Sequence, residues 1–240
     1  MDVCGRPMLA QQIRRLRHCG LVDEIVIATT TSSQDQAIVD LARAEGVGWF
    51  CGSEQDVLGR IVETARQARA DVVVRVTADC PLIDPEITDR VISDLVDHAT
   101  ECDYASNVGL TAPWFDTTTV SATKPLQRSF PRGLDVEAFF WDVLLRIDRL
   151  AKTSTAREHV TVLPRSERSD LFLVRTVADD EDNSDLRWTV DTEEDLQTVR
   201  TLYDELDLGS HLMPYADMLS YIRAHPHLQR FDHDSETQTG

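Results

Sequence analysis

Two aspartates are candidate catalytic residues, because each follows directly on a segment that favours a β-strand. Asp79 comes after the β-branched run 72–76, and Asp191 comes after 187–190. In an open α/β sheet, ligands bind outside the carboxyl ends of the strands. Two carboxylates at that edge can hold one Mg²⁺ that bridges phosphate oxygens. The pair therefore predicts metal-assisted chemistry on a phosphate-bearing substrate.

Each aspartate also has a purely structural interpretation. Asp79 could be a loop residue that accepts hydrogen bonds from nearby backbone amides. An acidic residue just before a helix interacts favourably with the helix dipole, and Thr192 with Asp195 resembles a capping box. Taken alone, the residues leave both interpretations open for Asp79 and favour the helix-terminus role for Asp191.

The segments around these aspartates alternate between strand and helix patterns. This alternation is typical of an α/β protein with a doubly wound, mostly parallel sheet. Apolar residues at helical spacing predict helices between the strands, the first ended by Gly20, the third capped by Ser53 and the fourth capped by Asp84. The expected strands cover residues 24–29, 47–50, 72–76, 103–107, 171–177 and 187–190.

The chain is expected to form one α/β domain over residues 1–207, followed by a helix and a polar tail within 208–240. Inside the domain, residues 108–131 are rich in Thr, Ser and Pro and show no clear period. A segment of this length without regular structure is typical of a lid or an oligomer arm. We therefore expect 108–131 to be a lid or a dimer arm.

The chain is strongly acidic, with a formal net charge of −18 from 42 acidic and 24 basic residues. This balance argues against a nucleic-acid-binding surface. The basic residues are nearly all arginines, since only Lys124 and Lys152 are lysines. An acidic, lysine-poor surface suits a halophilic protein, because concentrated salt screens the repulsion between like charges. We expect the midpoint of thermal unfolding to rise between low and molar KCl, and an unchanged midpoint would contradict this.

Hydropathy and cysteine usage predict a soluble, cytoplasmic protein that does not enter a membrane. No apolar run approaches the roughly 20 residues of a membrane span, and no charged-then-apolar leader opens the sequence. The five cysteines are scattered and form no CxxC pair, which is typical of a reducing compartment. Cys80 lies beside Asp79 but has no histidine neighbour in sequence, so a packed thiol is the favoured interpretation.

Residues 74–85, VRVTADCPLIDP, closely resemble the signature "VRxTGDCPLIDP" of the spore coat polysaccharide biosynthesis protein F group. That group belongs to the cytidylyltransferases, which include the acylneuraminate and ketodeoxyoctonate (KDO) enzymes. The resemblance covers residues 4–206, and several motifs in register are more specific than any one alone. The further matching stretches, in the same order, are 50–60, 106–107, 131–137, 157–161 and 191–196.

The resemblance implies a nucleotide-sugar transferase fold, which is Rossmann-like and related to the GT-A type. It implies transfer of CMP from CTP to a sugar or sugar acid with release of pyrophosphate, for surface polysaccharide or glycan synthesis. By position, Asp79 and Asp191 correspond to the Mg²⁺ ligands, and the metal would neutralise charge on the α-phosphate. Relatives are commonly dimers, so a homodimer is expected.

The resemblance also assigns expected roles to other polar residues. Arg75 and Arg60 are candidates for contact with phosphate or nucleotide. For Arg157 and His159 an alternative stays open, namely a polar helix face fixed by a salt bridge to a nearby glutamate, Glu158 or Glu137. The candidates for substrate and sugar binding are Asn107, Arg132, Asp135, Arg157 and His159.

One departure from the family pattern concerns the start of the chain. In the family, a strand and a loop of the type "IIQARMGSTRLPGK" precede the helix that Gly5-Arg6-Pro7 introduces here. That Gly-rich, basic loop would cradle the triphosphate. We expect either a misassigned start, which we favour, or a truncated chain whose neighbouring strands have a free edge. The 240-residue chain should then bind CTP weakly, and a micromolar dissociation constant would contradict this. Reading the upstream genomic DNA would distinguish the two.

Two further departures lie inside the matched region. Ala78 stands where the family usually has glycine, which would cost about 1 kcal/mol if the loop needs a positive φ there. The segment 109–130 is longer than the connection expected in relatives.

Two other functions remain open at this point. A metal-dependent glycosyltransferase of related fold would need an Asp-x-Asp pair, which Ala78-Asp79-Cys80 lacks. A truncated, non-catalytic subunit would associate with a partner without turnover. Incubation with CTP and a sugar acid, followed by detection of pyrophosphate, distinguishes these from a cytidylyltransferase.

Overall fold

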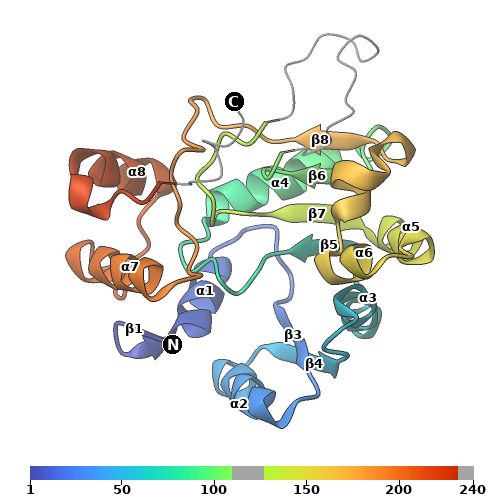
Figure 1. The fold of residues 1–240 in the computed structure, drawn as a ribbon, viewed down its shortest axis with the longest axis horizontal. Coiled ribbons are helices and arrows are strands. Elements are labelled where there is room, and N and C mark those ends of the chain that lie inside the picture. Colours follow the sequence, from blue (N-terminus) through green and yellow to red (C-terminus); the bar gives the residue numbers. More distant parts are fainter. Residues whose placement is uncertain (110–126, 232–240) are drawn as a thin grey trace.

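The computed structural model describes residues 1–109 and 127–231 of the chain (Figure 1). The strands are β1 (Asp2–Val3), β2 (Arg6–Pro7), β3 (Val26–Thr30), β4 (Gly48–Gly52), β5 (Val72–Arg75), β6 (Tyr104–Ser106), β7 (Glu137–Phe140) and β8 (Val174–Thr176). The α-helices are α1 (Met8–Leu16), α2 (Gln36–Glu45), α3 (Val57–Ala68), α4 (Pro85–Asp97), α5 (Trp141–Leu150), α6 (Ser154–His159), α7 (Glu193–Glu205) and α8 (Tyr215–Ala224).

The main sheet has the strand order β5-β7-β6-β8. Strands β6 and β8 are parallel, whereas β7 is antiparallel to both of its neighbours. Three strands therefore run in one direction and β7 alone runs against them, so the expectation of a mostly parallel sheet holds with this exception. The reversal arises because the chain enters β7 from the same edge at which β6 ends.

Strands β3 and β4 form a separate parallel pair, which Figure 1 shows below the main sheet. In the described part of the chain, β3 is hydrogen-bonded only to β4, and β5 only to β7. Within the described residues, each of these strands is therefore paired along one edge only. The valines of β5 are half-buried.

Helices cover both faces of the main sheet and bury two apolar clusters against it. On one face, α4 packs against Ala105 and Ala138 of the sheet. On the other face, α3 and α5 pack against Tyr104 and Phe139. Met218 of α8 is fully buried in the same cluster as α4, so the chain after residue 207 packs directly onto the α/β domain.

Several local predictions are confirmed. Asp84 is the N-cap of α4, its carboxylate accepting from the Ile87 amide, and Pro85 is the first helical residue. Thr192 caps α7 in a capping box with Asp195. The last helix covers Tyr215–Ala224 as expected.

Two helix boundaries were predicted wrongly. Helix α1 ends at Leu16 rather than at Gly20, whose amide instead donates to the carboxylate of Asp89. Helix α3 is capped by Asp56, and the Ser53 hydroxyl accepts from the Asp56 amide one turn earlier. At α1 the Asp89 carboxylate takes the Gly20 amide, and at α3 the Asp56 carboxylate accepts from the Gly59 amide in place of a Ser53 cap.

Two expected elements need separate comment. The segment 187–190 is no regular strand, since Arg187 forms only an isolated bridge with Arg132. Of the expected lid or dimer arm at 108–131, residues 110–126 lie outside the described residues. Its described end is anchored in the core, because Phe130 is fully buried.

Candidate active site

The strand register aligns one row of polar side chains at the carboxyl edge of the main sheet. Arg75 pairs with Glu137, Glu137 with Ser106, and Ser106 with Thr176. The loop after β5, the residue after β6 and the loop before β7 all leave the sheet at this edge. These segments carry Asp79, Asn107 and Asp135, so distant parts of the sequence meet in one place.

The loop carrying Asp79 is joined directly to the segment that leads to Asp191. The Val190 amide donates to the Asp79 carbonyl at 2.9 Å. The Thr189 hydroxyl donates to the Asp79 carboxylate at 3.0 Å and lies 3.2 Å from its carbonyl. The contact joins the Asp79 loop to the two residues that precede Asp191.

Asp191 lies just before α7, and the helix is capped by Thr192 and Asp195 as the sequence predicts. Thr192 caps the helix, and the Asp195 carboxylate accepts from the Asp191 and Thr192 amides at 3.1 and 2.9 Å. The Asp191 side chain is 54% exposed and is paired with Arg187. The Asp191 carboxylate therefore lies at the surface of the edge with Arg187 as its partner.

Arg187 is a site residue that the sequence analysis did not single out. Its guanidinium pairs with Asp191 and lies 3.5 Å from Asp195. Burial lowers the pKa of Arg187, but the hydrogen bond to Asp191 and the charges of both aspartates outweigh burial and raise it. In the sequence, only the spacing of four residues between Arg187 and Asp191 indicates this ion pair. The Arg187–Asp195 contact forms because Asp195 folds back towards Asp191 when it caps α7.

The loop before β7 lies against the same segment. The Arg132 amide donates to Leu186, and the Trp188 amide donates to the Arg132 carbonyl at 2.6 Å. Gly133 has φ +107°, and a Cβ there would lie 2.5 Å from the Thr189 nitrogen. Glycine is therefore required for the close approach of these two loops. The contact places Arg132, a sequence candidate, beside the segment that holds Asp79.

Asp135 is held at the same loop by Arg128. The two guanidinium bonds measure 2.6 and 2.7 Å, and the Gly133 amide adds a third donor at 3.1 Å. Burial raises the pKa of Asp135, but these donors outweigh burial and lower it. Asp135 is therefore an ionised group near Asp79, with a counter-charge already in place.

Arg75 belongs to a buried polar cluster centred on Glu137, which is 3% exposed. Arg75 donates to the Glu137 carboxylate, as do the Tyr104 hydroxyl at 2.6 Å and the Thr161 hydroxyl at 2.5 Å. Arg165 lies 3.9 Å from the same carboxylate. Two guanidinium groups therefore share one carboxylate, which leaves one positive charge in excess among Arg75, Arg165 and Glu137, with Asp79 as the next negative charge.

The pKa values agree with an ionised cluster. Burial raises the pKa of Glu137, but the charges of Arg75 and Arg165 and the two hydroxyl donors outweigh burial and lower it. Burial lowers the pKa of Arg75, but the Glu137 carboxylate outweighs it, with a further contribution from Asp79. The Asp79 charge therefore lies within electrostatic range of Arg75.

Asn107 has a clear structural function at this edge. Its side chain is fully buried, donates to the Leu134 carbonyl at 2.6 Å and accepts from the Val136 amide at 2.8 Å. These bonds hold the loop that carries Asp135. Contact of this amide with a substrate, as the resemblance implies, would require both bonds to break.

Arg60 and Arg157 lie apart from this group, in a hollow of about 460 Å³ at the start of α3. Arg60 donates to the Ser53 carbonyl at 2.5 Å. Arg157 binds Asp56 through two bonds of 2.8 and 2.6 Å and Asp148 at 2.6 Å. Arg157 is thus fixed by salt bridges, as the structural alternative predicted. Its partners, however, are Asp56 and Asp148 rather than Glu158 or Glu137.

His159 is exposed at the end of α6. Its carbonyl accepts from the Thr161 amide at 2.6 Å, across Val160 with φ 58° and ψ −60°. This is a γ-turn in a conformation that is strained for a β-branched residue. The turn directs Thr161 towards Glu137 and leaves the His159 ring at the surface.

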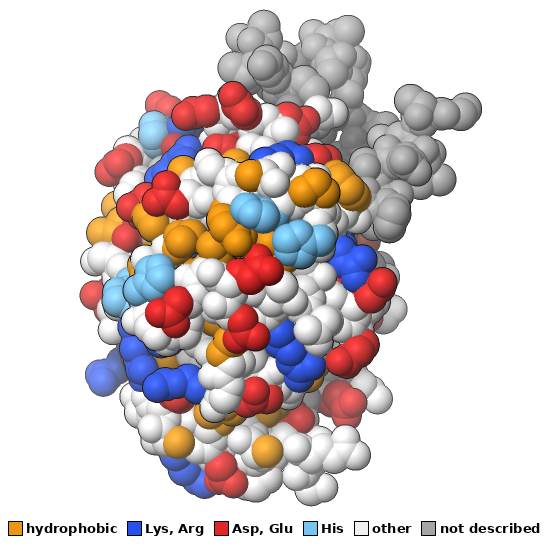
Figure 2. Space-filling view, turned by 90° about the vertical axis from the view of Figure 1, so that its left-hand side faces the viewer, with side chains coloured by type: hydrophobic (Ala, Val, Ile, Leu, Met, Phe, Trp, Pro, Cys, Tyr) orange, Lys and Arg blue, Asp and Glu red, His pale blue; other side chains and the backbone are white. Residues whose placement is uncertain are grey.

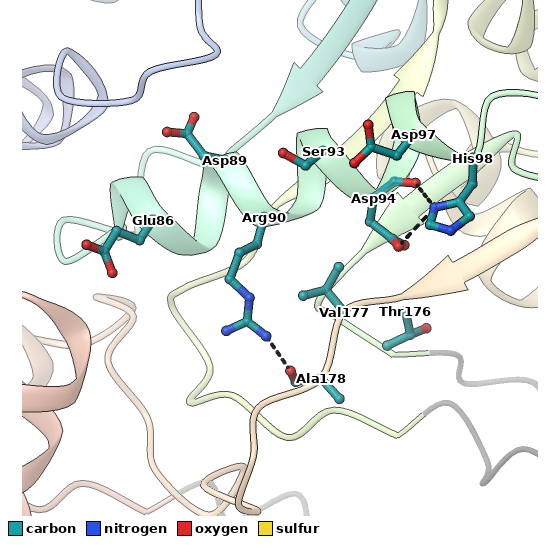
Figure 3. Close-up of a pocket in the computed structure, with 10 residues that line it drawn as sticks. All are labelled: Glu86, Asp89, Arg90, Ser93, Asp94, Asp97, His98, Thr176, Val177 and Ala178. Atoms are coloured by element: carbon teal, nitrogen blue, oxygen red, sulfur yellow. Dashed lines mark hydrogen bonds and ion pairs between the residues drawn. The ribbon is translucent and has the colours of Figure 1, made fainter.

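Another hollow, of about 630 Å³, lies along α4, and four of the ten side chains that line it are acidic (Figure 3). Asp94 in this hollow is already paired with Arg175 and His98. Acidic side chains are also spread over the face in Figure 2, where arginines form only small groups. Arginines instead line the hollow at the start of α3, where Arg60 and Arg157 lie, and the sheet edge holds the two candidate aspartates.

The acidic and thiol side chains of the edge form no preformed metal cluster within the described residues. Within residues 1–109 and 127–231, no three His, Cys, Asp or Glu side chains converge as a metal site. Mg²⁺ commonly uses one or two carboxylates together with substrate phosphates, which suits the pair Asp79 and Asp191. Cys80 is 2% exposed, and burial raises the pKa of its thiol, as expected for a packed thiol.

A family model described as cytidylyltransferase matches residues 1–205 of the chain. The chain belongs to this family. The match includes both aspartates and every polar residue of the sheet edge. None of the helices in the described ranges is long and apolar enough to cross a lipid bilayer.

Two relatives of this cytidylyltransferase span most of its length. An uncharacterised protein of Methanocaldococcus jannaschii is 31% identical over 205 residues, which are 85% of this chain and 75% of the relative. The spore coat polysaccharide biosynthesis protein SpsF of Bacillus subtilis is 27% identical over 186 residues, or 76% and 68% of the two chains.

Solved structures confirm the fold. A cytidylyltransferase from Leptospira borgpetersenii superposes with a TM-score of 0.83 and 25% identity, covering 97% of this chain and 91% of that one. The CMP:2-keto-3-deoxy-manno-octonic acid synthetase in complex with CTP gives a TM-score of 0.61 at 18% identity, covering 86% and 91%. The expected nucleotide-sugar transferase fold is therefore correct.

Proposed function

We propose that this cytidylyltransferase transfers CMP from CTP to a hydroxyl group of a sugar acid and releases pyrophosphate. The observation that carries the proposal is the contact between the loops of Asp79 and Asp191, made by the Val190 amide and the Thr189 hydroxyl. These aspartates would hold Mg²⁺, which would neutralise charge on the α-phosphate when bound. The family and the CTP complex of a fold neighbour support CTP as the donor.

The residues around the aspartates position them for this reaction. The Thr189 hydroxyl donates to one oxygen of the Asp79 carboxylate, and the Cys80 thiol donates weakly to the other at 3.6 Å. A cation would replace the weaker of these two contacts. Arg187 pairs with Asp191, and this ion pair would have to open if the Asp191 carboxylate held a metal ion. Because catalysis of nucleotidyl transfer depends mainly on position and charge, fixed carboxylates are the main contribution expected from the chain.

The Glu137 cluster supports an acidic acceptor. Arg75 and Arg165 leave one positive charge in excess, and the Nε of Arg165 is buried without a hydrogen-bond partner in the described residues. Buried charges are usually compensated, so an anionic group of the acceptor is favoured beside these arginines. Arg132 and His159 remain candidates for contact with the sugar, Arg60 remains a candidate for contact with the nucleotide, and a homodimer remains a proposal.

The function is tested by incubating the purified protein with millimolar CTP, Mg²⁺ and a panel of sugar acids and neutral sugars. We expect pyrophosphate and a CMP-sugar to form with an acidic sugar, and neither to form without acceptor. Replacement of CTP by ATP serves as the control for nucleotide choice. Release of a nucleoside diphosphate from a nucleotide sugar would instead support a glycosyltransferase, and association without turnover would support a non-catalytic subunit.

A further inference from the structure

Helix α1 carries two adjacent glutamines whose side chains are almost fully buried, Gln11 at 1% and Gln12 at 3% exposure. Both donate hydrogen bonds to backbone carbonyls of other segments. Gln11 donates to Val3 of the N-terminal hairpin at 2.9 Å. Gln12 donates to Thr77 at 2.6 Å and to Cys80 at 3.1 Å. Two neighbouring residues of the same type therefore hold two different parts of the molecule.

The two carbonyls that Gln12 binds lie on either side of Asp79. One amide nitrogen thus uses both of its protons to fix the ends of the turn that presents this carboxylate. The Cys80 amide also donates to the Thr77 carbonyl, at 3.3 Å. The turn is therefore stabilised by its own backbone hydrogen bond and by the two bonds from Gln12. Gln12 itself is too deeply buried to contact a substrate.

Two more side chains hold the rest of this loop by its carbonyls. Arg15, one turn after Gln12, donates to Ile83 at 2.6 Å. Tyr203 of α7 donates to Pro81 at 2.9 Å. Helix α7 begins just after Asp191, so the Tyr203 bond ties the loop of Asp79 to the helix that follows the second aspartate. Of these donors, only Gln12 reaches the residues that enclose Asp79.

We infer that Gln12 is a positioning residue, which sets the direction of the Asp79 carboxylate towards the cation. The inference rests on the proposed function, because it concerns the same metal site. Without the Gln12 amide, the Thr77 and Cys80 carbonyls lose a buried donor and the turn between them is free to relax. The Asp79 carboxylate then loses its alignment with Thr189 and with Asp191. Loss of an outer-shell partner typically lowers metal affinity about 10–100-fold.

The two glutamines provide a matched pair of variants. Gln12→Met and Gln11→Met each replace a buried amide by an apolar side chain of similar length on the same helix. We expect Gln12→Met to lower the affinity for Mn²⁺, measured by electron paramagnetic resonance without nucleotide, about 10-fold or more. The Mg²⁺ concentration for half-maximal pyrophosphate release should rise by a similar factor, with a smaller change in kcat at saturating Mg²⁺. Gln11→Met should bind Mn²⁺ as the wild type does.

A second variant, Gln12→Asn, keeps an amide but is one methylene shorter, and it covers the case in which Gln12→Met does not fold. It should also lower Mn²⁺ affinity. Wild-type affinity in a folded Gln12 variant, or an equal loss in Gln11→Met, would overturn the inference. Absence of both Mn²⁺ binding and turnover in the wild type would overturn the proposed function instead, so the two failures are distinguishable.

Discussion

Replacing Asp79 by asparagine is expected to lower the rate of CMP transfer more than about 100-fold, which exceeds the usual effect of losing an outer-shell partner. Asparagine has the same size and can still accept the Thr189 hydroxyl through its side-chain oxygen. The substitution therefore removes the negative charge while it leaves the loop in place. The rate is measured as pyrophosphate release at millimolar CTP and saturating Mg²⁺, together with Mn²⁺ affinity.

The matched control is Asp97→Asn, the same substitution at an exposed position on α4. It should leave both the rate and the Mn²⁺ affinity unchanged, whereas Asp191→Asn should reduce both. Circular dichroism and the unfolding midpoint are expected to be the same for all three variants. Near-wild-type turnover of a folded Asp79→Asn protein would show that this carboxylate holds no catalytic metal.

The sequence predicts well those features that depend on neighbours along the chain. The cap at Asp84, the capping box at Thr192 and the limits of α8 follow from residue types a few positions apart. The placement of Asp79 at a strand end is of the same kind, because a buried strand and the turn after it are both local patterns.

The contacts that complete the site are not local, and sequence spacing does not reveal them. Arg157 binds Asp56, 101 positions earlier in the chain, rather than the glutamate next to it. The antiparallel direction of β7 depends on where the chain returns to the sheet, and the pattern of apolar residues in the sequence does not predict this point. In the sequence, nothing distinguishes Gln12 from the other polar residues of an amphipathic helix, although its side chain binds a loop 65 positions later in the chain. Such pairings are determined only when the elements pack together.

The expected strain at Ala78 does not arise. Alanine would be strained there only at a positive φ, and Ala78 is not among the residues with positive φ. The strained residue at this edge is instead Val160, which nothing in its sequence context indicates. Its conformation follows from the position of Thr161 against Glu137, a contact that the fold imposes.

Replacing Glu137 by glutamine is expected to lower the free energy of unfolding by about 3–5 kcal/mol at pH 7. The carboxylate is buried, and its removal leaves the charges of Arg75 and Arg165 without their counter-ion. The single oxygen of a glutamine can keep the Tyr104 and Thr161 hydroxyls, which share Oε1. Its amide nitrogen cannot accept from Arg75, which donates to Oε2 of the glutamate. The loss is measured by urea denaturation.

The same substitution should change the dependence of stability on pH. The folded pKa of Glu137 lies below its ordinary value of 4.5, because the arginine charges and hydroxyl donors outweigh burial. An ionised Glu137 therefore stabilises the protein fully above about pH 4.5, and this contribution is lost as the pH falls through the folded pKa. Wild type and Glu137→Gln should thus differ most near neutral pH and approach each other in acid.

Glu158→Gln is the matched control, since Glu158 is an exposed glutamate on α6. Surface substitutions of this kind usually change stability by less than about 0.5 kcal/mol. If Glu137→Gln were equally mild, the carboxylate would not be the counter-ion of both arginines. The positive charge that we assign to an acidic acceptor would then lack its structural basis, because the excess charge arises only when one ionised Glu137 is shared by two guanidinium groups.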